Sequence, residues 1–165
     1  MAEKAIEIYL NDHLGGATLG SDLAQQILEQ SQPGALRNAM ANLVPEIEQD
    51  RETLLALMDA LEVSRNPVKQ VAGWFAEKAS RVKFSGATSA EPDAGILLAL
   101  ETLRLGVAGK RCLWLALAQS RGGLTSLAGF DFDALAERAG AQERTLEEQR
   151  LLTAARVLAT APTGA

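Results

Sequence analysis

Apolar residues recur along most of this chain at intervals of three and four positions, the spacing that places side chains on one face of an α-helix. A shorter amphipathic segment, residues 67–84, begins after Asn66 and Pro67, a cap and first-turn pair typical of a helix start. No segment alternates as a half-buried strand would. The pattern therefore predicts an all-α protein, with this short helix and four long helices at residues 4–30, 35–62, 93–119 and 131–160.

Clusters of helix-breaking residues lie between these segments. Residues 31–34, with Pro and Gly, separate the first two long helices. Pro45 lies inside the second segment, where we expect either a kink or the junction of two helices. Asp131 is expected to cap the last helix. The chain should then form one helical domain over residues 1–160, followed by a flexible tail at 161–165.

The connections between the predicted helices differ in length. They are short within the first and last pairs, whereas a crossover of about 30 residues joins the second long helix to the third. Three phrases accompany this plan: Tyr9-Leu-Asn-Asp-His-Leu14, Glu46-Ile-Glu-Gln-Asp50 and Leu100-Glu-Thr-Leu-Arg-Leu-Gly-Val-Ala-Gly-Lys110. In these features the chain resembles the ferritin-like superfamily, and it is similar to bacterial ferritin-like proteins of this size. The resemblance implies a ferritin-like four-helix bundle whose long crossover contains the additional short helix.

The same resemblance implies a carboxylate-bridged di-iron centre, with a Glu from each of two helices and a Glu-x-x-His motif from each of the other two. This chain departs from that pattern, because its only histidine is His13, which has Leu10 at the position of the motif's glutamate. Neither Glu46 nor Glu143 is followed by a histidine three residues later. We therefore expect a degenerate ferritin-like protein without a di-iron cofactor.

Ionisable residues interrupt the apolar stripes of the predicted helices. His13 falls in the stripe of the first helix and Asp50 in that of the second. At a rise of about 1.5 Å per residue, the two should be level in an antiparallel hairpin, with Lys110 and Gln142 at about the same height. A buried ion is costly without a partner. We predict a buried polar layer in which His13 pairs with Asp50.

A second buried layer is predicted from Glu101 and Arg150, which also occupy apolar stripes at matching heights. A carboxylate and a guanidinium can satisfy each other across a seam between helices. The alternative use of these residues is a metal or proton-transfer site. Its candidate ligands are His13, Glu46, Asp50 and Glu101, but Lys110, Arg51 and Arg150 would oppose a cation. We favour the structural interpretation.

Composition narrows the function classes. The chain is 47% hydrophobic with only 4% aromatic residues, which suits a helical protein. A net charge of −5 without basic clusters disfavours nucleic-acid binding. Cys112 is the only cysteine, so an internal disulfide is excluded and a reducing compartment is expected. No apolar run reaches the roughly 18 residues of a membrane span. These features predict a cytoplasmic protein.

Two segments suggest partners. The segment at 67–84 is basic and amphipathic, and we interpret it as a lid over the bundle; association with an anionic membrane is the alternative. The segment at 93–119 is apolar nearly all round, so it should be covered either by this lid or by a second subunit. We expect a homodimer.

Three functional hypotheses follow. The first is a non-enzymatic ferritin-like bundle with salt-bridged core layers in place of the di-iron site, acting through dimerisation or protein interaction. The second is an atypical or stress-related metal protein that uses His13 and carboxylates. The third is a module for a small apolar ligand or a membrane surface, using Trp74, Phe75 and Trp114. The sequence names no small-molecule ligand.

Overall fold

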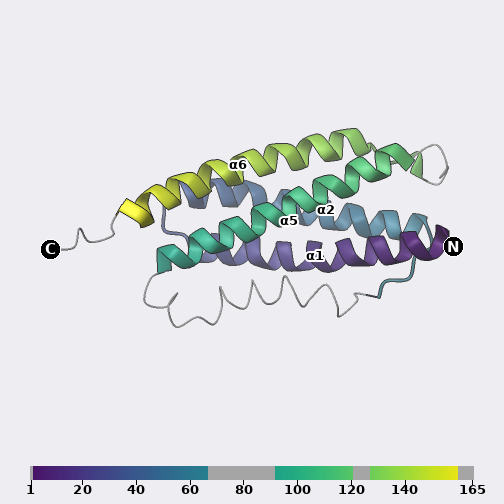
Figure 1. Cartoon of the computed structure of the whole chain (residues 1–165), viewed down its shortest axis with the longest axis horizontal. Coiled ribbons are helices and arrows are strands. Elements are labelled where there is room, and N and C mark those ends of the chain that lie inside the picture. The colour runs from purple at the N-terminus through teal and green to yellow at the C-terminus, as the bar shows by residue number, and fades with distance from the viewer. Residues whose placement is uncertain (1, 67–91, 121–126, 160–165) are drawn as a thin grey trace.

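The computed structural model describes residues 2–66, 92–120 and 127–159. Four long helices account for most of them, and no strand occurs among them. The helices pack side by side as a bundle, as Figure 1 shows. The predicted all-α class is therefore confirmed for the described part of the chain. The helices are α1 (Ala2–Gln30), α2 (Ala35–Ala60), α5 (Pro92–Ser120) and α6 (Phe132–Ala159).

The four helices form two hairpins that pack on each other. Helices α1 and α2 make one hairpin, α5 and α6 the other, while α1 also contacts α5 and α2 contacts α6. Helix α2 ends where α1 begins, whereas α5 begins at the opposite end of the bundle (Figure 1). A long crossover must therefore connect α2 to α5, as predicted. The predicted short helix at 67–84 and the tail at 161–165 lie outside the described residues.

The predicted helix boundaries agree with the observed ones to within a few residues, because local signals define them. Asp131 caps α6 as expected: its side-chain Oδ1 accepts a hydrogen bond from the backbone N–H of Ala134 at 3.0 Å. Pro45 lies inside a single helix, α2, so the alternative of two separate helices is wrong.

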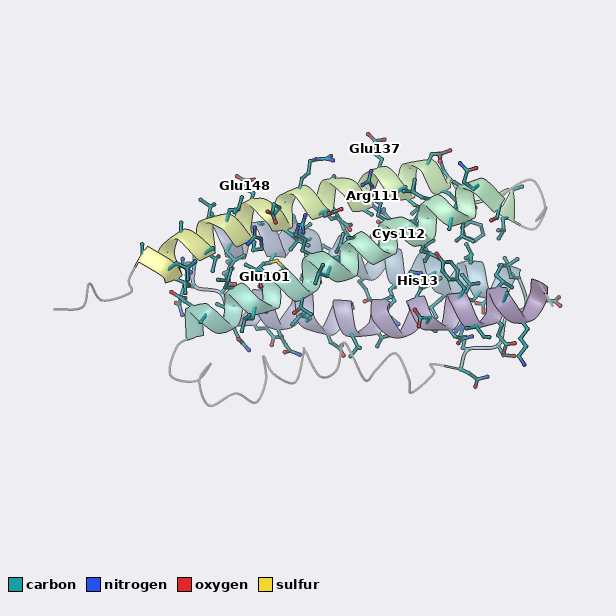
Figure 2. The ribbon with its side chains drawn as sticks, in the orientation of Figure 1. His13, Glu101, Arg111, Cys112, Glu137 and Glu148 are labelled. Atoms are coloured by element: carbon teal, nitrogen blue, oxygen red, sulfur yellow. The ribbon has the colours of Figure 1, made fainter. Side chains whose placement is uncertain are left out.

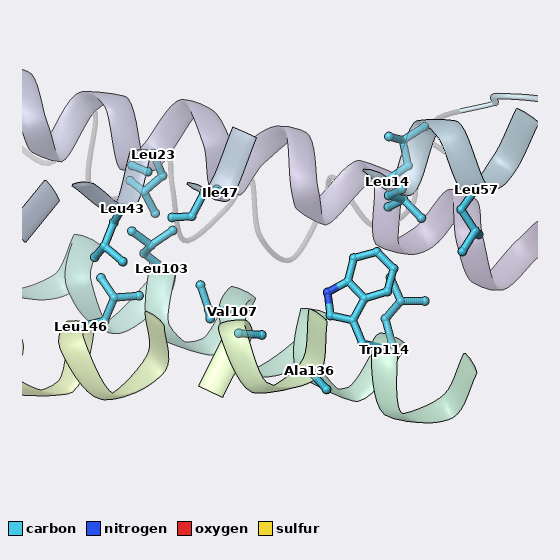
Figure 3. Packing of buried hydrophobic residues seen from close by; sticks show 14 of the residues in the cluster. Leu14, Leu23, Leu43, Ile47, Leu57, Leu103, Val107, Trp114, Ala136 and Leu146 are labelled. Atoms are coloured by element: carbon cyan, nitrogen blue, oxygen red, sulfur yellow. The ribbon is translucent and has the colours of Figure 1, made fainter. Parts of the chain in front are cut away.

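The core runs between the two hairpins. Trp114 and Phe132 are its largest fully buried side chains, with stacked rings whose centroids are 6.4 Å apart. Figure 3 shows apolar side chains from all four helices meeting along the bundle. In α1 the buried seam includes Leu14 and Leu23, whereas Tyr9 is 37% exposed. The buried face of α1 is therefore the one that packs on α2 and α5, and Tyr9 lies at its edge.

One buried polar residue, Asn11, fastens the chain beyond α2 to α1. Its side-chain Nδ2 donates to the backbone oxygens of Glu7 and Ser64, each at 2.9 Å. Its Oδ1 accepts a hydrogen bond from the backbone N–H of Asn66 at 2.7 Å. With only 2% of its surface exposed, Asn11 fixes where the crossover departs from the bundle.

Candidate functional site

A cluster of charged and polar side chains crosses the bundle between α2, α5 and α6. Its centre is Asp50 of α2, whose side chain is fully buried. Lys110 of α5 donates to Asp50 Oδ2 at 2.5 Å, and Arg138 of α6 donates to Asp50 Oδ1. Each carboxylate oxygen therefore faces its own cation, and Asp50 is doubly ion-paired.

Gln142 of α6 completes this cluster. Its Oε1 accepts a hydrogen bond from Lys110 Nζ at 2.6 Å, and its Nε2 lies 3.1 Å from Asp50 Oδ2 and 3.2 Å from Glu46 Oε2. Arg138 also donates to Gln49 Oε1 at 2.9 Å. These hydrogen bonds join α2 to α5 and α6, which lie far from it in the sequence, and every charge in the network has a partner.

Burial sets the electrostatics of this network. The side chain of Lys110 is 14% exposed and that of Arg138 is 29% exposed, so the cluster becomes more solvated toward Arg138. Burial lowers the pKa of the Lys110 ammonium from its ordinary value, and the Asp50 carboxylate opposes that shift. Because both Asp50 oxygens are engaged by cations, this carboxylate is poorly placed to act as a base or as a metal ligand.

The structure brings Lys110, Gln142 and Asp50 together at one level, as the register argument predicted, but His13 is not a hydrogen-bond partner of Asp50. His13 makes an edge-to-face contact with Tyr9, with ring centroids 4.7 Å apart, and it takes part in none of the hydrogen bonds among the described residues. The predicted His13–Asp50 pair is therefore wrong. Asp50 accepts hydrogen bonds from Lys110, Arg138 and Gln142, so its charge is compensated without the imidazole.

His13 instead gives the protein an expected pH dependence. Burial lowers its pKa from the ordinary value of 6.5, because charging the half-buried ring is unfavourable in the folded state. Below pH 6.5 the unfolded chain binds a proton that the folded chain resists, so stability falls as the pH decreases toward the folded pKa. The variant His13→Gln should therefore show a flatter change in melting temperature between about pH 7 and pH 5. If melting temperature changes equally with pH in the variant and the wild type, His13 is not the source of this pH dependence.

The second predicted layer lies at the surface. Glu101 is 46% exposed, and its contact with Arg150 is long, at 3.5 Å between Oε1 and Nη1. Arg150 bonds more closely to Glu147, one turn earlier on α6, at 2.7 and 2.8 Å. The prediction of a buried Glu101–Arg150 layer is therefore wrong. Leu105, one turn after Glu101, is 43% exposed as well, so this side of α5 is an outer face.

The candidate metal ligands do not converge. No group of three or more His, Cys, Asp or Glu side chains suited to a metal occurs in the part of the chain that the structure describes. Glu101 lies nine residues before Lys110 on α5, or about 13 Å along the helix axis. Glu46 lies one turn before Asp50 on α2, and its Oε2 accepts a hydrogen bond from Gln142 Nε2. The standard ligand set of a di-iron centre cannot be assembled from these positions.

A cavity of about 210 Å³ lies beside the ionic cluster, among α1, α2 and α5. Figure 2 shows His13 between α1 and α5, whereas Glu137 and Glu148 point outward from α6. His13 and Asp50 both line this cavity, so the sequence did place them near a common space. Trp114 lines it as well.

Sequence reasoning missed Arg138 as a member of the cluster. The available signal was its position four residues before Gln142, which puts both on one face of α6. Arg138 is an ordinary surface residue by composition, and only its reach across to α2 gives it a role.

Comparison of the chain with protein families, curated proteins and solved structures gave no match. None of the helices in the described ranges is long and apolar enough to cross a bilayer. The fold therefore defines the class of protein as an all-α four-helix bundle, and its function has to be argued from the site itself.

Proposed function

We propose that this chain is a non-enzymatic, ferritin-like helical bundle protein that acts by homodimerisation or protein interaction. In it, the ion-paired cluster of Asp50, Lys110 and Arg138 occupies the core position at which ferritin-like bundles hold metal. The helix directions and the long crossover support the ferritin-like assignment. The observation that carries the proposal is the double pairing of Asp50.

The physical reason is electrostatic. A hard cation needs several free carboxylate or carbonyl oxygens, and a positively charged neighbour raises the cost of binding it. Lys110 and Arg138 already supply the positive charge that a metal ion would bring to Asp50. The cluster therefore satisfies a buried carboxylate without metal and locks the register of α2, α5 and α6.

The proposal is tested by metal analysis of the full chain purified without chelator. We expect no stoichiometric iron, manganese or zinc, and no change in melting temperature when EDTA or divalent ions are added. Stoichiometric metal that disappears in both Asp50→Asn and His13→Gln would instead establish the metal-protein alternative.

The outer face of α5 supports the dimerisation part of the proposal. Leu98 and Leu105 are 48% and 43% exposed, lie two turns apart on this face, and are followed two turns later by the exposed Cys112. Sedimentation equilibrium should give twice the chain mass of 17.5 kDa, and Leu98→Glu with Leu105→Glu should give the monomer. A monomeric wild type at high concentration would overturn this part.

A further inference from the structure

Two arginines, one from α5 and one from α6, meet over the backbone of α6. Arg111 and Arg144 both reach Gly140, a buried glycine in the interior of α6. A Cβ atom at Gly140 would lie 3.4 Å from Arg111 Nε and 3.6 Å from Arg144 Nη1. Figure 2 places Arg111 between the two helices. The guanidinium groups of this arginine pair, Arg111 and Arg144, therefore lie close to the same point.

Neither guanidinium of the arginine pair has a counter-ion. Within the described ranges of the chain, Arg111 and Arg144 form no ion pair and no hydrogen bond. Both side chains are exposed, so a ligand in solution can reach them. Like charges held this close repel each other, and each guanidinium keeps its charge and its five N–H donors. A single oxyanion bound between them would satisfy both charges at once.

The neighbouring arginines at the seam between α5 and α6 each have a carboxylate partner. Arg104, two turns before Arg111 on α5, pairs with Glu143 and Glu147 at 3.3 and 3.0 Å. Arg150 of α6 pairs with Glu147 at 2.7 Å. Among the described arginines at this seam, the arginine pair is therefore the exception.

The carboxylates nearest to Arg144 along α6 do not neutralise the arginine pair. Glu137 lies two turns before Arg144 and Glu148 one turn after it. Both side chains point outward from α6 (Figure 2), and neither forms an ion pair with Arg144 in the part of the chain that the structure describes. Two positive charges therefore remain together over Gly140.

We propose that the arginine pair binds a doubly charged phosphate group. Guanidinium forks present their N–H donors in a plane that matches phosphate oxygens. A phosphate monoester carries close to two negative charges at neutral pH, which equals the charge of the pair, whereas one guanidinium already balances a carboxylate. Gly140 places no side chain between the two guanidiniums, so both can contact one ligand. The site is separate from the Asp50 cluster and does not depend on the proposed dimerisation.

The test compares phenyl phosphate with phenyl sulfate, which has the same shape but only one negative charge. Side-chain Nε–H signals of the ¹⁵N-labelled full chain are followed during titration at about pH 7.5, where the phosphate is doubly charged. Phenyl phosphate should shift the Arg111 and Arg144 signals in a saturable way, with a Kd about tenfold lower than that of phenyl sulfate. At about pH 5 the phosphate takes up a proton, so most of this preference should disappear. Inorganic phosphate should bind as well, and its Kd relative to that of phenyl phosphate shows whether the site takes the free ion or an ester.

Glutamine variants separate this site from the general charge of the protein. Arg111→Gln and Arg144→Gln should each raise the Kd for phenyl phosphate about tenfold. Arg65→Gln is the matched control, because it removes the same charge from an exposed arginine that pairs with Asp59, and it should change the Kd less than about twofold. All three variants should keep the wild-type helical circular dichroism, since the side chains are exposed. Equal Kd values for phenyl phosphate and phenyl sulfate, equal weakening in the three variants, or signals that no probe moves in the wild type would each overturn the proposal.

Discussion

Replacing Asp50 with alanine is expected to lower the free energy of unfolding by about 3–5 kcal/mol. The carboxylate is fully buried and neutralises Lys110, which is itself largely buried. Its removal leaves the Lys110 ammonium and Gln142 without their shared acceptor inside the core. Urea denaturation followed by circular dichroism measures the loss. Glu101→Ala is the matched control, because its ion pair is exposed and the substitution should change stability little.

A double variant distinguishes the ion pair from simple packing. Asp50→Leu combined with Lys110→Met removes both buried charges, while Arg138, at 29% exposure, can turn toward solvent. The double variant should therefore be more stable than the sum of the single losses predicts, because neither charge remains unpaired. If the stability loss of the double variant equals the sum of the losses in Asp50→Leu and Lys110→Met, the two residues contribute to stability independently.

Truncating Phe132 is the other substitution with a large expected effect. Phe132→Ala should cost about 3–5 kcal/mol, because the ring is fully buried and its removal leaves a cavity. The ring stacks between Trp114 and Phe130, with centroids 6.4 and 6.0 Å away. The measurement is again urea denaturation, with Leu158→Ala as control because Leu158 is 68% exposed. A loss below about 1 kcal/mol would mean that the α6 start is not packed as described.

The ionic cluster shows which contacts can be predicted from the rise of a helix and which cannot. Asp50 interrupts an apolar stripe that is otherwise correct, and Lys110 and Gln142 were placed at its height from helix rise alone. The partner was nevertheless wrong: Asp50 pairs with Lys110 and Arg138 and not with His13. Height along a bundle follows from counting residues, whereas the direction of a side chain depends on the rotation of each helix.

The prediction of a buried Glu101–Arg150 layer was wrong for a related reason. Helix α5 is apolar on several sides, so its periodicity does not specify which face is inside. The inner face carries Leu100, Leu103 and Val107, and Glu101 lies on the outer one. Asn11 was missed for the opposite reason. An asparagine in a helix carries no sequence signal of burial, and its partners include Ser64 and Asn66, far away in the chain.

The sequence by itself determined the helical class, the limits of the four long helices, the cap at Asp131 and the long crossover, because spacing and capping are local properties. Only the tertiary structure decided which face of each helix is buried, that Arg138 reaches Asp50, and that His13 lines a cavity beside the ionic cluster. Those features depend on how the helices rotate and approach one another. That choice is made by the packing of all four helices together, which no single segment encodes.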